Sequence, residues 1–332
     1  MASPVVRWTF HASGPIGSQV AVADDVVYLV ATNGRVTALD LVGGTTRWVT
    51  DVGVSADGSP TIAGDLLLVP TEAGLDALRL ADGLPAWTAK ATGPIRGAPA
   101  AVGDRIIVAS YDGRVTLLDA LTGSITWSKK VASAIDTSPA VEDGIAVIGT
   151  TDGWAVALSM EDGAQLWRTD TGDRVRVGTP AIDGGVAYVG TLSPARSGSH
   201  HLIALDLATG AILWRVASPG DVPAYSPAIS GGSLYVDSES KVALALDPAT
   251  GATRWRDPLP GVDEIVASVA GGVVYTATNG GFVIALDGAS GRELWRSPIL
   301  GTPYGMAVTA GAVVVGTNTG TLMAIGGTLP SP

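Results

Sequence analysis

Residues 204–214 read Ala-Leu-Asp-Leu-Ala-Thr-Gly-Ala-Ile-Leu-Trp. The tryptophan that ends this stretch belongs to a series that runs along the whole chain: Trp8, Trp48, Trp87, Trp127, Trp167, Trp214, Trp255 and Trp295. Successive members are 40, 39, 40, 40, 47, 41 and 40 residues apart. From the second member onward, each has a glycine four residues before it and a leucine nine residues before it. Self-similarity at a period of about 40 residues indicates a repeat architecture.

Each period divides into four short apolar runs separated by turn-forming residues. Residues 104–119 read Asp-Arg-Ile-Ile-Val-Ala-Ser-Tyr-Asp-Gly-Arg-Val-Thr-Leu-Leu-Asp, and a Thr-Gly pair at 122–123 and Ile-Thr-Trp at 125–127 follow. Short apolar runs bounded by Gly and Asp turns are typical of β-hairpins. Four strands in about 40 residues are the signature of one β-propeller blade. The sequence therefore predicts eight blades.

The two ends of the chain complement each other. Three more strands follow Trp295 and the sequence then stops without another tryptophan, whereas residues 5–8 read as a fourth strand without a blade. Pairing of these segments closes the ring and removes two exposed sheet edges. We therefore expect an all-β protein: a single closed eight-bladed β-propeller over residues 1–328, with four antiparallel strands per blade. Residues 1–8 form the closing strand of blade eight, and residues 329–332 form a tail.

Composition excludes several classes of protein. The formal net charge is −11, whereas nucleic-acid binders carry a basic face, so we expect no nucleic-acid partner. The sequence has no apolar stretch long enough for a transmembrane segment. The chain has no cysteine, which excludes disulfides, thiolate metal sites and a cysteine nucleophile. Residues 1–4 show no secretory pattern, so we expect any signal or lipid anchor to lie outside this sequence.

The eight repeated tryptophans are interpreted as structural. The same residue types recur at one place in every blade, whereas a binding site uses a few blades differently. A buried indole at the outer strand needs close approach of a neighbouring backbone, which the repeated glycine permits.

The pattern Ala-Leu-Asp-x-x-Thr-Gly-x-x-x-Trp resembles the tryptophan-docking repeat of the PQQ-like, or quinoprotein-type, β-propellers. This family includes the quinoprotein alcohol and glucose dehydrogenases, the outer-membrane assembly lipoprotein BamB and extracytoplasmic sensor domains of bacterial Ser/Thr kinases. The resemblance therefore implies the fold and favours an extracytoplasmic location in bacteria, but it leaves the function open.

The same resemblance supplies a test for an enzyme. An active quinoprotein dehydrogenase of this family is implied to need an adjacent cysteine pair over the quinone, a calcium held by Glu, Asn and Asp, and an Asp base. Without cysteine this set has no counterpart here, which argues against PQQ and calcium as cofactors. The histidines are His11, His200 and His201, and no Gly-x-Ser-x-Gly elbow is present, so no residue qualifies as catalytic or as a metal ligand.

Binding residues are expected where the blades differ. In a propeller, the loops from the fourth strand to the next blade and the loops from the second to the third strand share one face, here called the loop face. Binding residues are commonly found on such loops. Residues just before the inner strands, or beside them, form a mixed ring around the axis: Asp57, Arg96, Asp136, Arg174, Arg176, Tyr225, Glu264 and Tyr304. A solvated rim without function is the alternative interpretation of this ring.

Residues 192–201 form the one long irregularity. This insertion replaces the two-residue turn between the second and third strands of blade five, and it carries Arg196, His200 and His201. Trp154 begins the third strand of the preceding blade, at the position that His201 occupies in blade five, so we expect the two on the same rim. An exposed Trp beside an Arg/His loop is typical of a partner anchor. A tolerated loop, and partial burial of Trp154 against the adjacent blade, are the alternatives.

Together these features predict a non-catalytic binding scaffold. We expect it to be a monomer that recognises a protein partner or a small ligand on the loop face, as an extracytoplasmic sensor or a BamB-like assembly module. The alternative function is a PQQ-dependent dehydrogenase.

Overall fold

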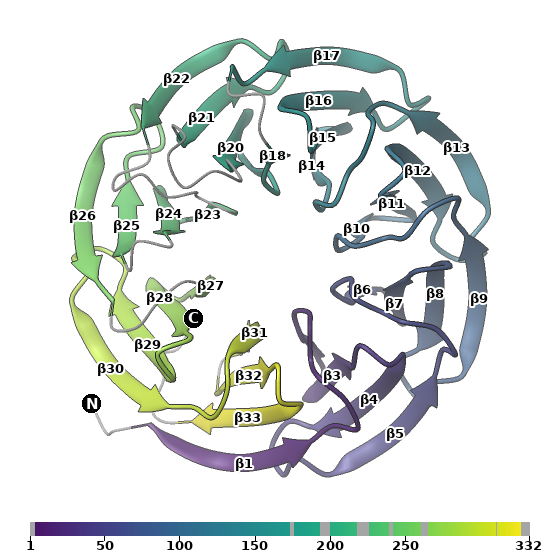
Figure 1. The fold of residues 1–332 in the computed structure, drawn as a ribbon, viewed down its shortest axis with the longest axis vertical. Coiled ribbons are helices and arrows are strands. Elements are labelled where there is room, and N and C mark those ends of the chain that lie inside the picture. Colours follow the sequence, from purple (N-terminus) through teal and green to yellow (C-terminus); the bar gives the residue numbers. More distant parts are fainter. Residues whose placement is uncertain are drawn as a thin grey trace.

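A computed structural model describes residues 4–172, 176–192, 200–217, 226–238, 242–259, 265–309 and 311–326. Within these ranges every regular element is a β-strand, and the strands form eight antiparallel sheets arranged as a ring (Figure 1). No helix in this part of the chain is long and apolar enough to cross a bilayer. The predicted all-β, eight-bladed propeller is confirmed.

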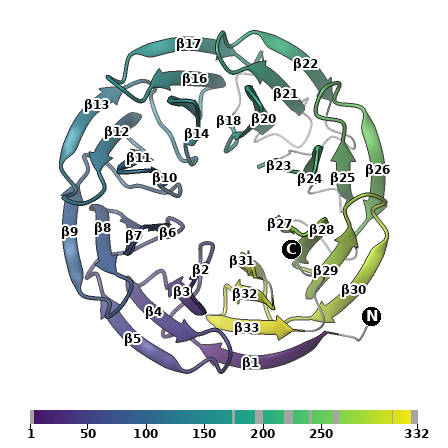
Figure 2. The same ribbon diagram turned by 180° about the vertical axis from the view of Figure 1, so that it is seen from behind.

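The strands follow the repeat in chain order, from the axis outward (Figures 1 and 2). Blade one contains β2 (Ala21–Ala23), β3 (Val26–Val30), β4 (Arg35–Asp40) and β5 (Thr46–Asp51). Blade two contains β6 (Thr61–Ala63), β7 (Leu66–Thr71), β8 (Gly74–Arg79) and β9 (Pro85–Lys90). Blade three contains β10 (Ala100–Val102), β11 (Arg105–Ala109), β12 (Arg114–Asp119) and β13 (Ile125–Lys130). Blade four contains β14 (Ala140–Glu142), β15 (Ile145–Gly149), β16 (Trp154–Ser159) and β17 (Gln165–Asp170).

The second half of the ring has the same order, except for an extra strand in blade five and for blade eight, whose outer strand is β1. Blade five contains β18 (Arg176–Val177), β19 (Ala181–Asp183), β20 (Val186–Leu192), β21 (His201–Asp206) and β22 (Ile212–Ala217). Blade six contains β23 (Ala228–Ser230), β24 (Ser233–Ser238), β25 (Val242–Leu246) and β26 (Thr253–Pro258). Blade seven contains β27 (Ile265–Ala270), β28 (Val273–Thr278), β29 (Phe282–Asp287) and β30 (Glu293–Pro298). Blade eight contains β31 (Pro303–Val308), β32 (Val313–Thr317), β33 (Thr321–Gly326) and β1 (Val5–His11).

Blade five departs from the expected four strands. Its second strand, β20, continues to Leu192, and the added length pairs with the extra two-residue strand β18 through Arg176 and Leu192. β19 pairs with the first part of β20, as an inner strand does in the other blades. The extra strand therefore follows from the extension of β20 toward the insertion.

The ring closes as predicted, through the two ends of the chain. β1 pairs antiparallel with β33, from Val5 opposite Gly326 to His11 opposite Thr321. The closing strand ends at His11, three residues beyond the expected end at Trp8. Residues 1–3 and 327–332, which include the expected tail, lie outside the described residues.

Each tryptophan of the repeat joins two blades. A β-bulge lies one residue before it in every outer strand, as at Arg47, where Ala38 pairs with Trp48 but Leu39 pairs with Thr46. Seven indole Nε1 atoms donate to a carbonyl of the next blade, at 2.7–3.3 Å: Trp8 to Leu41, Trp48 to Leu80, Trp87 to Ala120, Trp127 to Met160, Trp167 to Leu207, Trp214 to Pro248 and Trp255 to Gly288. These bonds satisfy the polar atom of a ring that packs between sheets.

The glycine of the repeat lies against the tryptophan of the preceding blade. At Gly123, a Cβ would lie 2.4 Å from Cε3 of Trp87, and the backbone has a φ of +68°. A side chain at this position would be both strained and in collision with the indole. The repeated glycine and tryptophan therefore mark the same contact between neighbouring blades, which recurs around the ring.

A second set of contacts joins the inner strands around the axis. Backbone N–H groups donate to a side-chain oxygen of the next blade: Gln19 to Ser59 at 3.1 Å, Ala98 to Ser138 at 2.8 Å, Ser138 to Thr179 at 3.3 Å and Met306 to Gln19 at 2.8 Å. These bonds hold the starts of adjacent blades together, directly beside the loop face.

Candidate functional site

In several blades the hairpin of the loop face is held by a buried hydroxyl at the end of the second strand. Thr71, Thr150 and Thr317 occupy this position with 0–1% of their surface exposed, and Ser110 occupies it in blade three with 4%. Their hydroxyls bond the hairpin backbone, as Thr150 Oγ1 does to the carbonyl of Trp154 at 3.1 Å. The residue after the hydroxyl is therefore held in place at the surface.

In blade three this next residue is Tyr111. Its N–H donates to the carbonyl of Pro94 at 2.8 Å, which fixes the hairpin 110–113 against the loop 91–99 from blade two. The same loop is tied to blade two by Ile95 N–H, which donates to the carbonyl of Thr71 at 3.1 Å. Two short segments from neighbouring blades thus form one connected surface.

Arg96 and Tyr111 form an exposed pair on this surface. The Arg96 guanidinium carbon lies 4.1 Å from the centre of the Tyr111 ring. Arg96 is exposed, and 41% of Tyr111 is accessible to solvent. A cation over an aromatic face at this distance is held by the ring quadrupole, so both side chains are oriented before any partner arrives.

Asp112 fastens the same hairpin from the other side. Its carboxylate accepts hydrogen bonds from Thr92 Oγ1 at 2.5 Å and Ser110 Oγ at 2.6 Å, and Arg114 Nε lies 3.7 Å away. Partial burial opposes ionisation of Asp112, but the bonds from Ser110 and Thr92 outweigh this effect and lower its pKa. The carboxylate is therefore charged at neutral pH and committed to the loop structure.

Three of the sequence-predicted residues, Asp57, Arg96 and Asp136, lie on consecutive loops with alternating charge. A Cβ at Gly58 would lie 3.0 Å from the carbonyl of Ile95, and one at Gly97 would lie 2.4 Å from the carbonyl of Thr137. The loops that carry these residues therefore touch one another in order around the axis. Asp57 is exposed and Asp136 is partly exposed.

Tyr304 also lies on the ring, in blade eight. It is the bulged residue of β31, between Pro303, which pairs with Thr317, and Gly305, which pairs with Gly316. The bulge leaves 40% of Tyr304 exposed. For Arg176 the structure describes the backbone, which is part of β18, but not the side chain. Four other predicted contact residues lie outside the described residues: Arg174, Arg196, Tyr225 and Glu264.

The two histidines at the insertion differ in exposure. His200 has only 3% of its surface exposed, and its contact with a partner stays a prediction. His201 begins β21, as expected, and its Nδ1 lies 3.3 Å from Nη2 of Arg215 on β22. His11 lies in blade eight, far around the ring from blade five (Figure 1). Residues 193–199 of the insertion lie outside the described residues.

Trp154 begins β16, as expected, but it packs against blade three. It contacts the cluster that contains Ile107 and Ile148, from blades three and four, and the Arg168 guanidinium carbon lies 4.2 Å from its ring centre. Because side chains alternate along a strand, Trp154 shares its face with Val156 and is directed away from blade five. Partial burial against an adjacent blade, one of the two interpretations of this residue, accounts for Trp154.

Tyr111 is an exposed residue of the loop face that the sequence analysis did not single out. Its signal appears when the hairpins are compared position by position. The other seven blades have Thr32, Glu72, Thr151, Leu192, Glu239, Asn279 and Asn318 where blade three has Tyr111. An aromatic side chain at this otherwise aliphatic or polar position marks a local difference between blades.

The donor set for a quinone and calcium site does not fit this chain. The sequence has no cysteine. In the ranges that the structure describes, no three His, Asp or Glu side chains gather as a metal-binding group. The loop face instead offers an exposed cation, an aromatic ring and flanking carboxylates, which suits non-covalent recognition.

The family model of the outer membrane protein assembly factor BamB matches residues 3–98, 75–192 and 151–327, which together cover almost the whole chain. The chain belongs to the BamB family. A curated relative, BamB of Moranella endobia (strain PCIT), is 35% identical over 88 residues. That match spans 25% of this chain and 23% of the relative.

Solved structures share the fold at low identity. The crystal structure of BamB from Moraxella catarrhalis covers 98% of this chain and all of its own, with a TM-score of 0.79 and 18% identity. A quinohemoprotein alcohol dehydrogenase from Pseudomonas putida HK5 matches 99% of this chain and 77% of its own, with a TM-score of 0.75 and 15% identity. At such identities the likeness shows the fold alone.

Proposed function

We propose that the protein is a non-catalytic binding scaffold that recognises a protein partner on its loop face. Arg96 and Tyr111 are its central contacts, and Asp57 and Asp136 flank them. The exposed Arg96–Tyr111 stack carries the proposal, because arginine and tyrosine are enriched among the residues that dominate binding energy at interfaces. The backbone hydrogen bonds that hold the loops of Arg96 and Tyr111 in place reduce the conformational entropy lost on binding.

Membership of the BamB family supports a protein partner rather than a small ligand, and an assembly role in an extracytoplasmic compartment. The alternating signs of Asp57, Arg96 and Asp136 suit a partner surface with matching charges. Tyr304 would extend the contact area across the ring. A PQQ-dependent dehydrogenase is the second candidate, supported by shared fold only, and the absence of cysteine argues against it.

The test is site-specific photo-crosslinking in living cells of the source organism. We expect a Tyr111→p-benzoylphenylalanine variant to give an adduct with one defined protein. The control is the same replacement at Leu121, which is 83% exposed in the turn between β12 and β13, on the opposite face. Adducts from residue 121 and none from residue 111 would show that the partner binds the opposite face, which would refute the proposal.

The captured protein is then purified and its affinity for the scaffold measured. We expect Arg96→Ala to weaken binding by about tenfold, which corresponds to a hot-spot contribution of about 1.4 kcal/mol. Unchanged affinity in Arg96→Ala would remove the stack from the interface.

A further inference from the structure

The gap between blades two and three is incompletely filled. In each gap the indole fills the end near the turns between third and fourth strands, and the side chains two and four residues later point to the same side of the strand. In blade two, Trp87 is followed at these positions by Ala89 and Ala91. Other blades carry at least one larger side chain there, such as Val52, Val131, Leu259 or Ile299.

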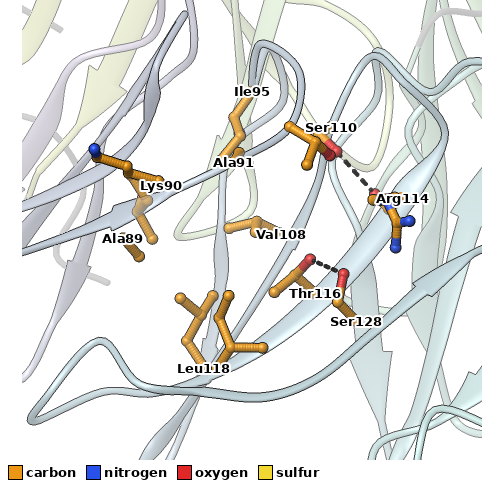
Figure 3. Close-up of a pocket in the computed structure, with 13 residues that line it drawn as sticks. Ala89, Lys90, Ala91, Ile95, Val108, Ser110, Arg114, Thr116, Leu118 and Ser128 are labelled. Carbon is orange, nitrogen blue, oxygen red and sulfur yellow. Dashed lines mark hydrogen bonds between the residues drawn. The ribbon is translucent and has the colours of Figure 1, made fainter.

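The two alanines leave a cavity of about 100 Å³ between the blades. Figure 3 shows Ala89 and Ala91 on one side, Thr116 and Ser128 on the other, and Val108 between them. The hydroxyls of Thr116 and Ser128 bond each other at 2.9 Å, so each already has a partner. The rest of the wall is mainly aliphatic, and its polar members are Lys90, Thr92, Ser110 and Arg114. One water needs roughly 10–15 Å³ of such volume, so the cavity accepts a group much larger than a water molecule.

The cavity lies next to the proposed interface. Ile95 lines it and is followed directly by Arg96, while Ser110 lines it and is followed directly by Tyr111. A partner that contacts the Arg96–Tyr111 pair therefore lies beside residues that line the cavity.

Two basic side chains lie beside Thr116 and Ser128, on the same strands of blade three. Arg114 lies two residues before Thr116 on β12, and Lys130 lies two residues after Ser128 on β13, so both point to the cavity side of blade three. They are register partners. With Arg96 on the adjoining loop they give three basic side chains, of which Arg114 also lies 3.7 Å from the Asp112 carboxylate. The net charge of the whole protein is −11.

We infer that this cavity is the anchor pocket for an apolar side chain on an acidic segment of the partner. The apolar walls around Ala89 and Ala91 take the side chain, and Arg96, Arg114 and Lys130 take the flanking carboxylates. Residues that dominate binding energy cluster in well-packed, desolvated pockets, with contacts around them that exclude water. This inference rests on the proposed function and adds the chemistry of the bound segment.

The probe is the peptide acetyl-Asp-Glu-Leu-Glu-Asp-amide, titrated to millimolar concentration and followed by methyl NMR of labelled Ala, Leu and Val residues. We expect shifts concentrated at Ala89, Ala91 and Val108. A peptide with alanine in place of leucine should bind about tenfold more weakly, because it buries less apolar surface. A peptide with lysine in place of the acidic residues should not bind.

Two pairs of variants test the pocket and its charges. Ala91→Leu fills the cavity and should abolish the shifts, whereas Ala12→Leu, the same exchange at the matching position after Trp8, should not. Lys130→Ala should weaken binding, whereas Lys129→Ala should not, because Lys129 points to the opposite side of β13. Both surface lysine variants are expected to fold normally.

The absence of methyl shifts, shifts that persist in Ala91→Leu, or binding of the lysine peptide would overturn the inference. The photo-crosslink from residue 111 distinguishes failure of the anchor-pocket inference from failure of the proposed function. If Ala91→Leu retains that crosslink at full yield, the scaffold role stands and the anchor pocket is refuted. If the peptide binds the cavity but residue 111 gives no adduct, the proposed interface is wrong and the pocket remains.

Discussion

Replacing Gly123 with alanine should destabilise the protein far more than the same replacement at Gly103. Both glycines belong to blade three and have positive φ values, +68° and +59°. The left-handed conformation therefore costs about 1–2 kcal/mol in each variant. A Cβ at Gly103 meets no atom within 4 Å, whereas one at Gly123 lies 2.4 Å from Trp87.

The collision at Gly123 adds two further costs. Overpacking a close contact costs about 1–3 kcal/mol, and moving the indole weakens the 3.0 Å bond from Trp87 Nε1 to the carbonyl of Ala120, worth about 1 kcal/mol. We therefore expect Gly123→Ala to lose about 2–4 kcal/mol more than Gly103→Ala. At about 2 °C per kcal/mol for a chain of this size, the melting temperatures should differ by about 4–8 °C.

Thermal and urea unfolding followed by circular dichroism measure the difference. In a Trp87→Ala background the ring is gone, so Gly123→Ala should cost no more than Gly103→Ala does. Equal losses in the two single variants, or a Gly123→Ala cost that persists without Trp87, would refute the idea that the repeated glycine exists to receive the indole.

Three other outcomes are expected. Deleting residues 1–11 removes β1 and exposes the edge of β33, so it should cause aggregation or a large fall in melting temperature, whereas deleting residues 1–4 should not; equal stability of the two would contradict closure by β1. The bond from Thr209 Oγ1, at 2.6 Å, lowers the pKa of Asp206 below its unfolded value, so stability present above about pH 4 should be lost as the pH falls through the folded pKa. Asp206→Asn should flatten this acid decline in melting temperature, and an unchanged decline would show that the turn carboxylate plays no part. Incubation with PQQ and calcium should give no dye-linked alcohol oxidation, and turnover that a chelator abolishes would restore the dehydrogenase candidate.

The fold was predictable because the residues that form the contact between neighbouring blades, a tryptophan and a glycine, recur once per blade. A tryptophan and a glycine at constant spacing report the same inter-blade packing each time, so even the orphan strand at residues 5–8 could be assigned to the last blade. The extra strand β18 was not predictable in this way. It depends on how far β20 continues, and the repeat contains no counterpart for that extension.

The candidate site was less accessible to sequence reasoning. Arg96 was identified by its place in the ring, but its partner Tyr111 comes from a different blade and loop, and only the packing of the two loops brings them together. The direction of Trp154 follows from strand alternation with Val156, which the assignment to a rim had not used. His200 is buried, and the local sequence carries no signal for that burial.

The pairing of β1 with β33 also sets the order in which the molecule can be completed. His11 and Thr321 are 310 residues apart, and β1 precedes every other strand. Seven blades are built from adjacent segments and can form as the chain emerges, but β1 waits without a partner until β33 has been made. Any shorter translation product keeps two open sheet edges, which are sites for aggregation and for recognition by quality-control proteases. Ring closure thus couples the hiding of these edges to synthesis of the chain through β33.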